Sequence, residues 1–166
     1  MARERDAGSE PQIRQATAED AEGIYGLTEE LALAVADTHP EPEAVRERLA
    51  ELLEEPRARV VVVEGESGLV GAASLWIKPD LAHGDTVIEV PMLVVTESSR
   101  YKGVGKRLIA EVRKIAAENG ATLIELVATR ENRTAQAFYR SLGFVDADLV
   151  SLEFLGDMKP LPDNKG

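Results

Sequence analysis

The sequence of 166 residues has no cysteine, two histidines, one tryptophan, three tyrosines and three phenylalanines. The absence of cysteine excludes disulfides, thiolate metal sites and a cysteine nucleophile. His39 and His83 are too few to predict a zinc site, so no metal is expected. The longest apolar stretch, Leu31 to Ala36, is far too short to span a bilayer, and the charged N-terminus does not resemble a signal peptide. These absences predict a cytoplasmic protein without a membrane partner.

Basic residues are also scarce, since 19 lysines and arginines stand against 30 acidic residues, giving a net charge of −11. Nonspecific nucleic-acid binding draws on basic side chains that displace counterions from phosphate, so nucleic acid is not an expected partner. One stretch departs from this balance. Between residues 100 and 114 only Glu111 is acidic, whereas six residues are basic: Arg100, Lys102, Lys106, Arg107, Arg113 and Lys114. An anion could be held at the start of this stretch.

The order of the expected elements predicts one mixed α/β domain at residues 12–155, with a central sheet and flanking helices, between polar tails at 1–11 and 156–166. The spacing of apolar residues, together with helix caps and turn glycines, predicts four helices. They lie at 17–35, 41–56, 104–119 and 132–144. Runs of β-branched residues predict strands at 12–16, 86–95, 122–128 and 149–155, and a hairpin at 58–77. The strand, helix and strand from residue 86 to 128 form a parallel crossover unit.

A glycine-rich stretch, Arg100-Tyr101-Lys102-Gly103-Val104-Gly105, joins the strand at 86–95 to the next helix. A Walker loop would need glycine at position 100 and serine or threonine at 107, where this chain has arginine both times. The dinucleotide fingerprint would need glycine at position 108, which is leucine. The remaining pattern is R-x-x-G-x-G before a helix, whose first amide hydrogens and positive dipole end favour a diphosphate.

This pattern does not stand alone, because a Leu-Val-Val run precedes it and the sequence "NRTAQAFYRSLGF" follows one helix and one strand later. Together the three motifs resemble the GCN5-related N-acetyltransferase (GNAT) superfamily over roughly residues 87–144. The resemblance implies the GNAT fold and acetyl-CoA as cofactor. It implies that the main chain of Leu93, Val94 and Val95 pairs with the pantetheine arm. It further implies cofactor contacts at Asn132 and at the loop residues Arg100, Tyr101, Lys102, Gly103, Val104, Gly105 and Lys106. Tyr101 departs from the superfamily pattern, in which many members have glycine there.

The chemistry of acetyl transfer suggests two catalytic residues. Glu89, the only charged residue of an otherwise apolar strand, is the candidate base that removes a proton from the amine, with a pKa raised by partial burial. Pro91 in the same strand lacks a ladder donor and predicts a β-bulge that splays the strand. The resemblance places Tyr139 beside the cofactor's sulfur, and its phenol can donate a proton to the departing thiolate, whose pKa is about 8.5.

The sequence therefore predicts an N-acetyltransferase that acts on a small primary amine by direct attack in a ternary complex. Two alternatives stay open: a noncatalytic acyl-CoA sensor, and an enzyme that modifies protein N-termini or lysines. Asn132 also suits a helix N-cap, Glu89 could simply form an ion pair or face water, and His39, His83 and Trp76 could border the acceptor. The sequence is also compatible with a homodimer.

Overall fold

A computed structural model describes residues 10–159 of the chain. Its centre is a five-stranded sheet in the order β1-β2-β3-β4-β5. The strands are β1 (Gln12–Gln15), β2 (Ala58–Gly65), β3 (Gly68–Asp80), β4 (Asp85–Val95) and β5 (Leu123–Leu126). The first four pair antiparallel with their neighbours, whereas β4 and β5 pair parallel through the crossover helix. The mixed α/β architecture and its parallel crossover unit are therefore confirmed.

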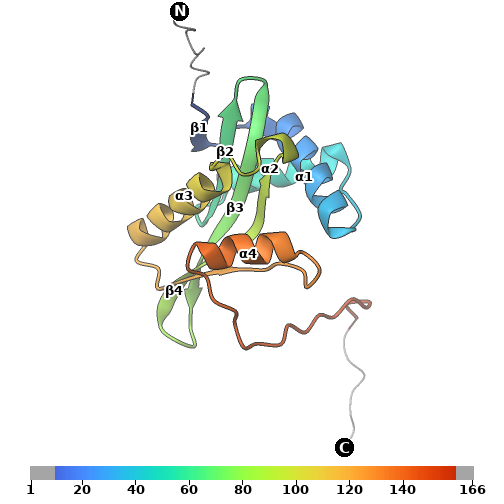
Figure 1. Cartoon of the computed structure of the whole chain (residues 1–166). Helices are drawn as coiled ribbons and strands as arrows, with labels where there is room; N and C mark the ends of the chain where they lie inside the picture. The colour runs from blue at the N-terminus through green and yellow to red at the C-terminus, as the bar shows by residue number, and fades with distance from the viewer. Residues whose placement is uncertain (1–9, 160–166) are drawn as a thin grey trace, which may run out of the picture.

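The helices cover the two faces of the sheet (Figure 1). They are α1 (Ala21–Val35), α2 (Pro42–Glu54), α3 (Val104–Glu118) and α4 (Arg133–Ser141), and short 3-10 turns, η1 (Ala18–Asp20) and η2 (Glu97–Ser99), precede α1 and α3. Helices α1 and α2 pack on one face, with Ile24, Leu27 and Leu49 against Val60 and Val62. Helix α3 packs on the other face through Leu108 and Val112. The sheet is thus buried between two layers of helix.

The entry to α1 is held by a buried carboxylate. Asp20 is 8% exposed and accepts two hydrogen bonds from Arg14 of β1, at 2.8 and 2.9 Å, and one from the Thr17 N–H at 2.7 Å. The Arg14 guanidinium, followed by the backbone bond from Thr17, lowers the pKa of Asp20 against the opposing effect of burial. Through Asp20, the capping box that it forms with Thr17 is joined to the first strand.

The predicted strand at 149–155 is wrong. These residues form no strand, and Leu149, Val150, Leu152, Phe154 and Leu155 are between 66% and 90% exposed. Figure 1 shows this part of the chain running below the domain without joining the sheet. An alternating apolar pattern favours β structure only where a neighbouring strand supplies hydrogen bonds and an apolar face.

The division into one domain and two tails stays a prediction, and the tail residues 1–9 and 160–166 lie outside the described residues. Within residues 10–159, none of the helices has both the length and the apolar character needed to cross a membrane.

Candidate active site

The sheet splits at the bulge that Pro91 predicts. Ser74 of β3 pairs with Met92 and Trp76 pairs with Glu89, so Val90 and Pro91 of β4 both lie opposite Leu75. On its other side β4 pairs with β5 only from Val87 to Val90. From Pro91 to Val95 no strand of the described chain lies on the β5 side, because β5 ends at Leu126. Among the described residues, this half of β4 therefore has no strand partner on one edge, where an extended ligand can pair with its main chain.

The residues of this free half of β4 divide between the two faces of the sheet. Val94 is 4% exposed and packs with α1 and α2, whereas Leu93 and Val95 pack partly buried on the α3 side. The Val94 side chain is therefore in the core, whereas the side chains of Leu93 and Val95 are partly accessible.

The predicted anion loop follows at the start of α3. Gly103, with φ of 84°, is the N-cap of α3, and Tyr101 has φ of 63°. The left-handed region costs a residue with a Cβ about 1 kcal/mol relative to glycine, so the loop needs glycine-like backbone at both positions. The first α3 hydrogen bond runs from the Arg107 N–H to the Gly103 carbonyl at 3.0 Å. The amides of Val104, Gly105 and Lys106 come before it, and helix geometry leaves them available to an anion.

The side chains of the loop are mostly exposed, and Tyr101 is 93% exposed. The Arg100 side chain folds back, and its Nε donates to the Val95 carbonyl at 3.3 Å. Val104 is the exception, because it is only 3% exposed and belongs to the α3 core.

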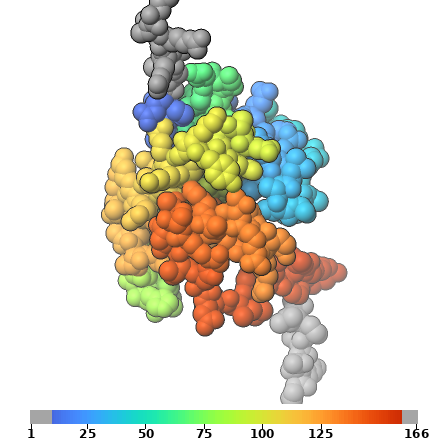
Figure 2. Space-filling model, in the orientation of Figure 1, coloured from blue at the N-terminus to red at the C-terminus, as the bar shows by residue number. Residues whose placement is uncertain are grey.

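The loop requires glycine at positions 103 and 105 for different structural reasons. A Cβ at Gly103 would meet no atom within 4 Å, so its positive φ is what requires glycine there. A Cβ at Gly105 would lie 2.9 Å from Cζ of Phe138. Gly105 therefore lets α4 pack closely on the start of α3, whereas the sequence suggested that a ligand approached the backbone there. Figure 2 shows the result, with the segment around residue 100 (yellow) directly above α4 (orange) on the same face.

Helix α4 carries Tyr139, which is partly buried. Its ring lies 5.3 Å from that of Phe138 and packs edge-on against Phe144 at 5.8 Å, measured between ring centroids. Burial raises the pKa of the Tyr139 phenol above its usual value, so the group keeps its proton at neutral and moderately alkaline pH. The helix begins after Asn132, whose side-chain oxygen accepts from the Ala135 N–H at 3.1 Å. Asn132 is thus an N-cap, and only the rest of its amide group is left for a ligand.

Glu89 lies just before the bulge and forms an ion pair with a residue of the neighbouring strand. Its carboxylate accepts a hydrogen bond from Lys78 Nζ at 2.9 Å, and the two side chains are 43% and 51% exposed. This bond is the main cause of the raised pKa of Lys78, and the charge of Glu125 adds to it. Glu89 is partly buried, and it forms the ion pair that the sequence leaves open as an alternative to the role of a base.

Of the three residues whose roles were left open, Trp76 lies beside Glu89. Trp76 of β3 pairs with Glu89 on one side of β4, and Glu125 of β5 pairs with Glu89 on the other side. His83 lies in the β3–β4 turn, where its Nδ1 is 2.6 Å from Asp80 Oδ2, which raises its pKa. His39 is exposed in the loop between α1 and α2.

A small apolar cavity lies between α1, α2 and the sheet, and it reaches the bulge. Its volume is about 200 Å³. Ser74 and Met92, the pair that borders the bulge, form its floor, and the single charged residue of its lining is Arg48 of α2. The other lining residues are Ile24, Thr28, Pro40, Ala44, Val45, Leu49, Leu52 and Val60. No local sequence pattern indicates this cavity, because its walls come from five elements, α1, α2, β2, β3 and β4, and from the loop before α2.

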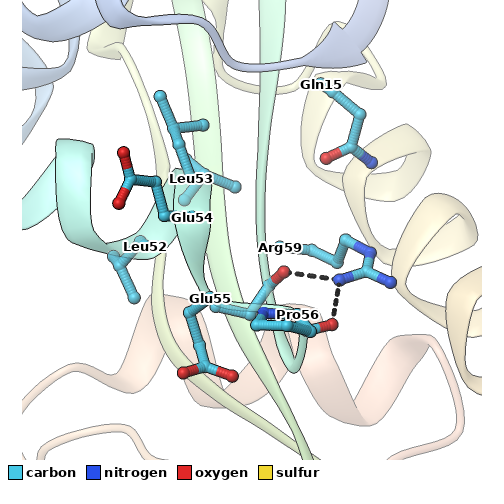
Figure 3. Close-up of a pocket in the computed structure, with 9 residues that line it drawn as sticks. Gln15, Leu52, Leu53, Glu54, Glu55, Pro56 and Arg59 are labelled. Atoms are coloured by element: carbon cyan, nitrogen blue, oxygen red, sulfur yellow. Dashed lines mark hydrogen bonds between the residues drawn. The ribbon is translucent and has the colours of Figure 1, made fainter.

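A second hollow of about 350 Å³ lies at the end of α2 (Figure 3). There Arg59 Nη1 donates to the carbonyls of Pro56 and Ala58 at 2.7 Å each. None of the predicted site residues lines this hollow, and the Arg59 bonds serve the turn from α2 into β2.

Comparisons with known proteins agree with this geometry. Residues 21–144 match the model of the acetyltransferase (GNAT) family. The chain is 30% identical over 144 residues to an aminoalkylphosphonate N-acetyltransferase of Salmonella typhimurium, covering 87% of this chain and 91% of the relative. Among solved structures, an aminoglycoside N-acetyltransferase in complex with CoA is 25% identical, with a TM-score of 0.77 over 89% of this chain and 95% of the other. A glucosamine-6-phosphate N-acetyltransferase from Arabidopsis thaliana shares the fold at 18% identity, with a TM-score of 0.74 over 89% of this chain and all of the other. The chain therefore belongs to the acetyltransferase (GNAT) family, and its enzymatic class is that of an N-acetyltransferase.

Proposed function

We propose that the protein transfers the acetyl group of acetyl-CoA to the primary amine of a small molecule that carries an anionic group. The observation that carries the proposal is the split between β4 and β5 at the Pro91 bulge, next to the free amides at the start of α3. These features fit coenzyme A, which has an extended pantetheine arm and a diphosphate. Main-chain groups from Leu93 to Val95 would hold the arm. Residues 100–106 would hold the diphosphate, with Asn132 as a further contact.

Bound acetyl-CoA supplies an acyl group activated as a thioester, and the protein supplies proton transfers and orientation. An alkyl amine has a pKa of about 10.4, so near neutral pH its nitrogen carries a proton that must leave before attack. Glu89 accepts this proton, directly or through water. Tyr139 gives its proton to the sulfur as the carbon–sulfur bond breaks. Because the chain has no cysteine, we propose direct attack by the amine.

The role of Glu89 can be tested through the pH dependence of kcat. The change Glu89→Gln should lower kcat near pH 7 about 100-fold, because a positioned base is typically worth that much or more. The difference should shrink as the pH rises toward the pKa of the amine, because the free amine then needs no base. Glu125→Gln removes the neighbouring carboxylate of β5 and should leave the profile close to that of the wild type. Superimposable profiles of wild type and Glu89→Gln would remove Glu89 from the mechanism.

The acceptor is proposed from the cavity and from the relative that acts on aminoalkylphosphonates. A volume of about 200 Å³ holds roughly seven groups of the size of a water molecule, at about 30 Å³ each. 2-Aminoethylphosphonate has seven non-hydrogen atoms. Its ethylene segment suits the apolar walls, and Arg48 at the lining can bind an anionic group. The amine would then lie toward the bulge, which shares Ser74 and Met92 with the cavity floor.

Release of free thiol from acetyl-CoA tests both the activity and this choice of acceptor. We expect kcat/KM to be at least tenfold higher for 2-aminoethylphosphonate than for n-propylamine, which lacks the anion. Arg48→Gln should remove most of this preference. Arg46→Gln is a matched control on the same helix, since the Arg46 and Arg48 side chains are both 66% exposed. Each also forms an ion pair with a glutamate three residues away, Arg46 with Glu43 and Arg48 with Glu51. Thiol release with none of a panel of amines would overturn the proposed function, whereas equal rates with the two amines would overturn only the anionic acceptor.

A further inference from the structure

Glu30 of α1 lies far in sequence from every predicted site residue but contacts the segment that leads into the anion loop. One oxygen of its carboxylate accepts from the Thr96 hydroxyl at 2.7 Å, and the other accepts from the Glu97 N–H at 3.1 Å. Glu97 is the first residue of the turn η2, whose N-cap is Thr96. A carboxylate at the N-terminus of a helical turn satisfies an amide that has no acceptor within the turn. Here that cap comes from another element.

The contacts continue from η2 to the loop. The Ser99 N–H donates to the Thr96 carbonyl at 3.0 Å, and the Arg100 N–H donates to the Glu97 carbonyl at 3.2 Å. The Thr96 N–H donates in turn to the Val70 carbonyl of β3 at 2.9 Å. The residues after Arg100 hold the left-handed backbone at Tyr101 and Gly103. The position of Glu97 thus determines where the loop begins.

We propose that Glu30 is a positioning residue for the cofactor loop, fixing residues 96–100 so that the amides at the start of α3 converge on the coenzyme A diphosphate. This inference rests on the proposed cofactor. Helix α1 then contributes to both sides of the site. Its Ile24 and Thr28 line the cavity on the acceptor side, and its Glu30 positions the loop on the cofactor side. Glu30 acts through Thr96 and Glu97 and touches neither substrate.

The sign of the effect separates this role from simple electrostatics. Glu30 brings a negative charge toward a site for a polyanion, so charge alone predicts that Glu30→Gln binds coenzyme A more tightly. Loss of the cap predicts weaker binding, because the free protein must then order the loop. Glu29→Gln makes the same change of charge at the adjacent residue, whose carboxylate accepts from Tyr25 within α1 at 2.9 Å. This control should bind coenzyme A as the wild type does, or slightly more tightly.

Calorimetry with coenzyme A, followed by kinetics with acetyl-CoA, tests the role. We expect Glu30→Ala to raise Kd about tenfold and Glu30→Gln about threefold, because an amide oxygen can still accept one of the two hydrogen bonds. KM for acetyl-CoA should rise by the same factors, with kcat changed less than twofold. Thr96→Val should weaken coenzyme A binding, whereas Thr96→Ser, which keeps the hydroxyl, should bind as the wild type does. The effects of Glu30→Ala and Thr96→Val on Kd should not add, because both changes break the same contact.

The outcomes separate the two proposals. If the wild type gives no heat with coenzyme A, the proposed function fails. If the wild type binds and Glu30→Ala binds equally or more tightly, only the role of Glu30 is overturned. A loss of kcat at unchanged Kd would also overturn it, because a loop-positioning residue acts on cofactor affinity.

Discussion

Replacing Tyr139 by phenylalanine should lower kcat about 100-fold or more while leaving KM for acetyl-CoA nearly unchanged. The hydroxyl is the only group removed, and the ring contacts with Phe138 and Phe144 remain, so α4 should keep its packing. A proton donor that acts while the carbon–sulfur bond breaks contributes to the transition state and little to ground-state binding. Steady-state kinetics, with circular dichroism to verify the fold, measures this difference.

The pH dependence sharpens the test of Tyr139. Because burial raises the pKa of the phenol above 10, the wild type should retain the acid function throughout the neutral and moderately alkaline range. Tyr25→Phe is the control, since the Tyr25 hydroxyl bonds Glu29 within α1 at 2.9 Å. It should leave kcat within about twofold of the wild-type value. If Tyr139→Phe turns over as fast as Tyr25→Phe, Tyr139 is not the acid.

The largest effect on stability should come from Asp20→Ala. The change leaves the Arg14 guanidinium with the Glu64 carboxylate and the Gln15 carbonyl as partners, and leaves the Thr17 N–H without its carboxylate acceptor. Breaking a buried ion pair from one side typically costs 3–5 kcal/mol. Because the Arg14 side chain is 30% exposed, water compensates part of this loss. We expect the free energy of unfolding to fall by about 3 kcal/mol, measured by urea denaturation.

Glu64→Ala is the matched control, because it removes the other carboxylate that pairs with Arg14. That contact is 3.0 Å long, but the Glu64 side chain is 48% exposed, so its loss should cost less than about 1 kcal/mol. Equal losses for Asp20→Ala and Glu64→Ala would contradict the assigned importance of burial. A double variant with Arg14→Met should lose much less than the sum of the single losses.

Asp20 should also affect how the free energy of unfolding changes at acidic pH. The folded-state pKa of Asp20 is lowered, chiefly by Arg14, so its contribution to stability is fully present above the unfolded pKa of about 3.9. It is lost as the pH falls through the lower folded value. Wild type should therefore lose stability below about pH 4 more steeply than Asp20→Ala, which has already lost this contribution.

Features that depend on neighbours along the chain were predictable from the sequence. Apolar spacing and caps located the four helices, and the crossover from β4 to β5 followed from their order. Pro91 predicted the bulge because a missing N–H breaks a ladder wherever it occurs. The motif glycines located the turn before α3, and the left-handed φ at Gly103 agrees. The failed strand at 149–155 marks the limit of this reasoning, because a strand also needs a partner.

The sequence by itself determined the elements, the family motifs and the position of the loop, because each of these depends on residues within a few positions of one another. Tertiary structure alone decided which side chains meet. The Phe138 ring packs where a side chain at Gly105 would lie, and Lys78 forms an ion pair with Glu89. Glu30 accepts a hydrogen bond from Thr96, which is 66 positions away in the sequence. Residues of five elements enclose the cavity beside the bulge. Contacts of this kind depend on how the layers pack, and no local spacing in the chain encodes that packing.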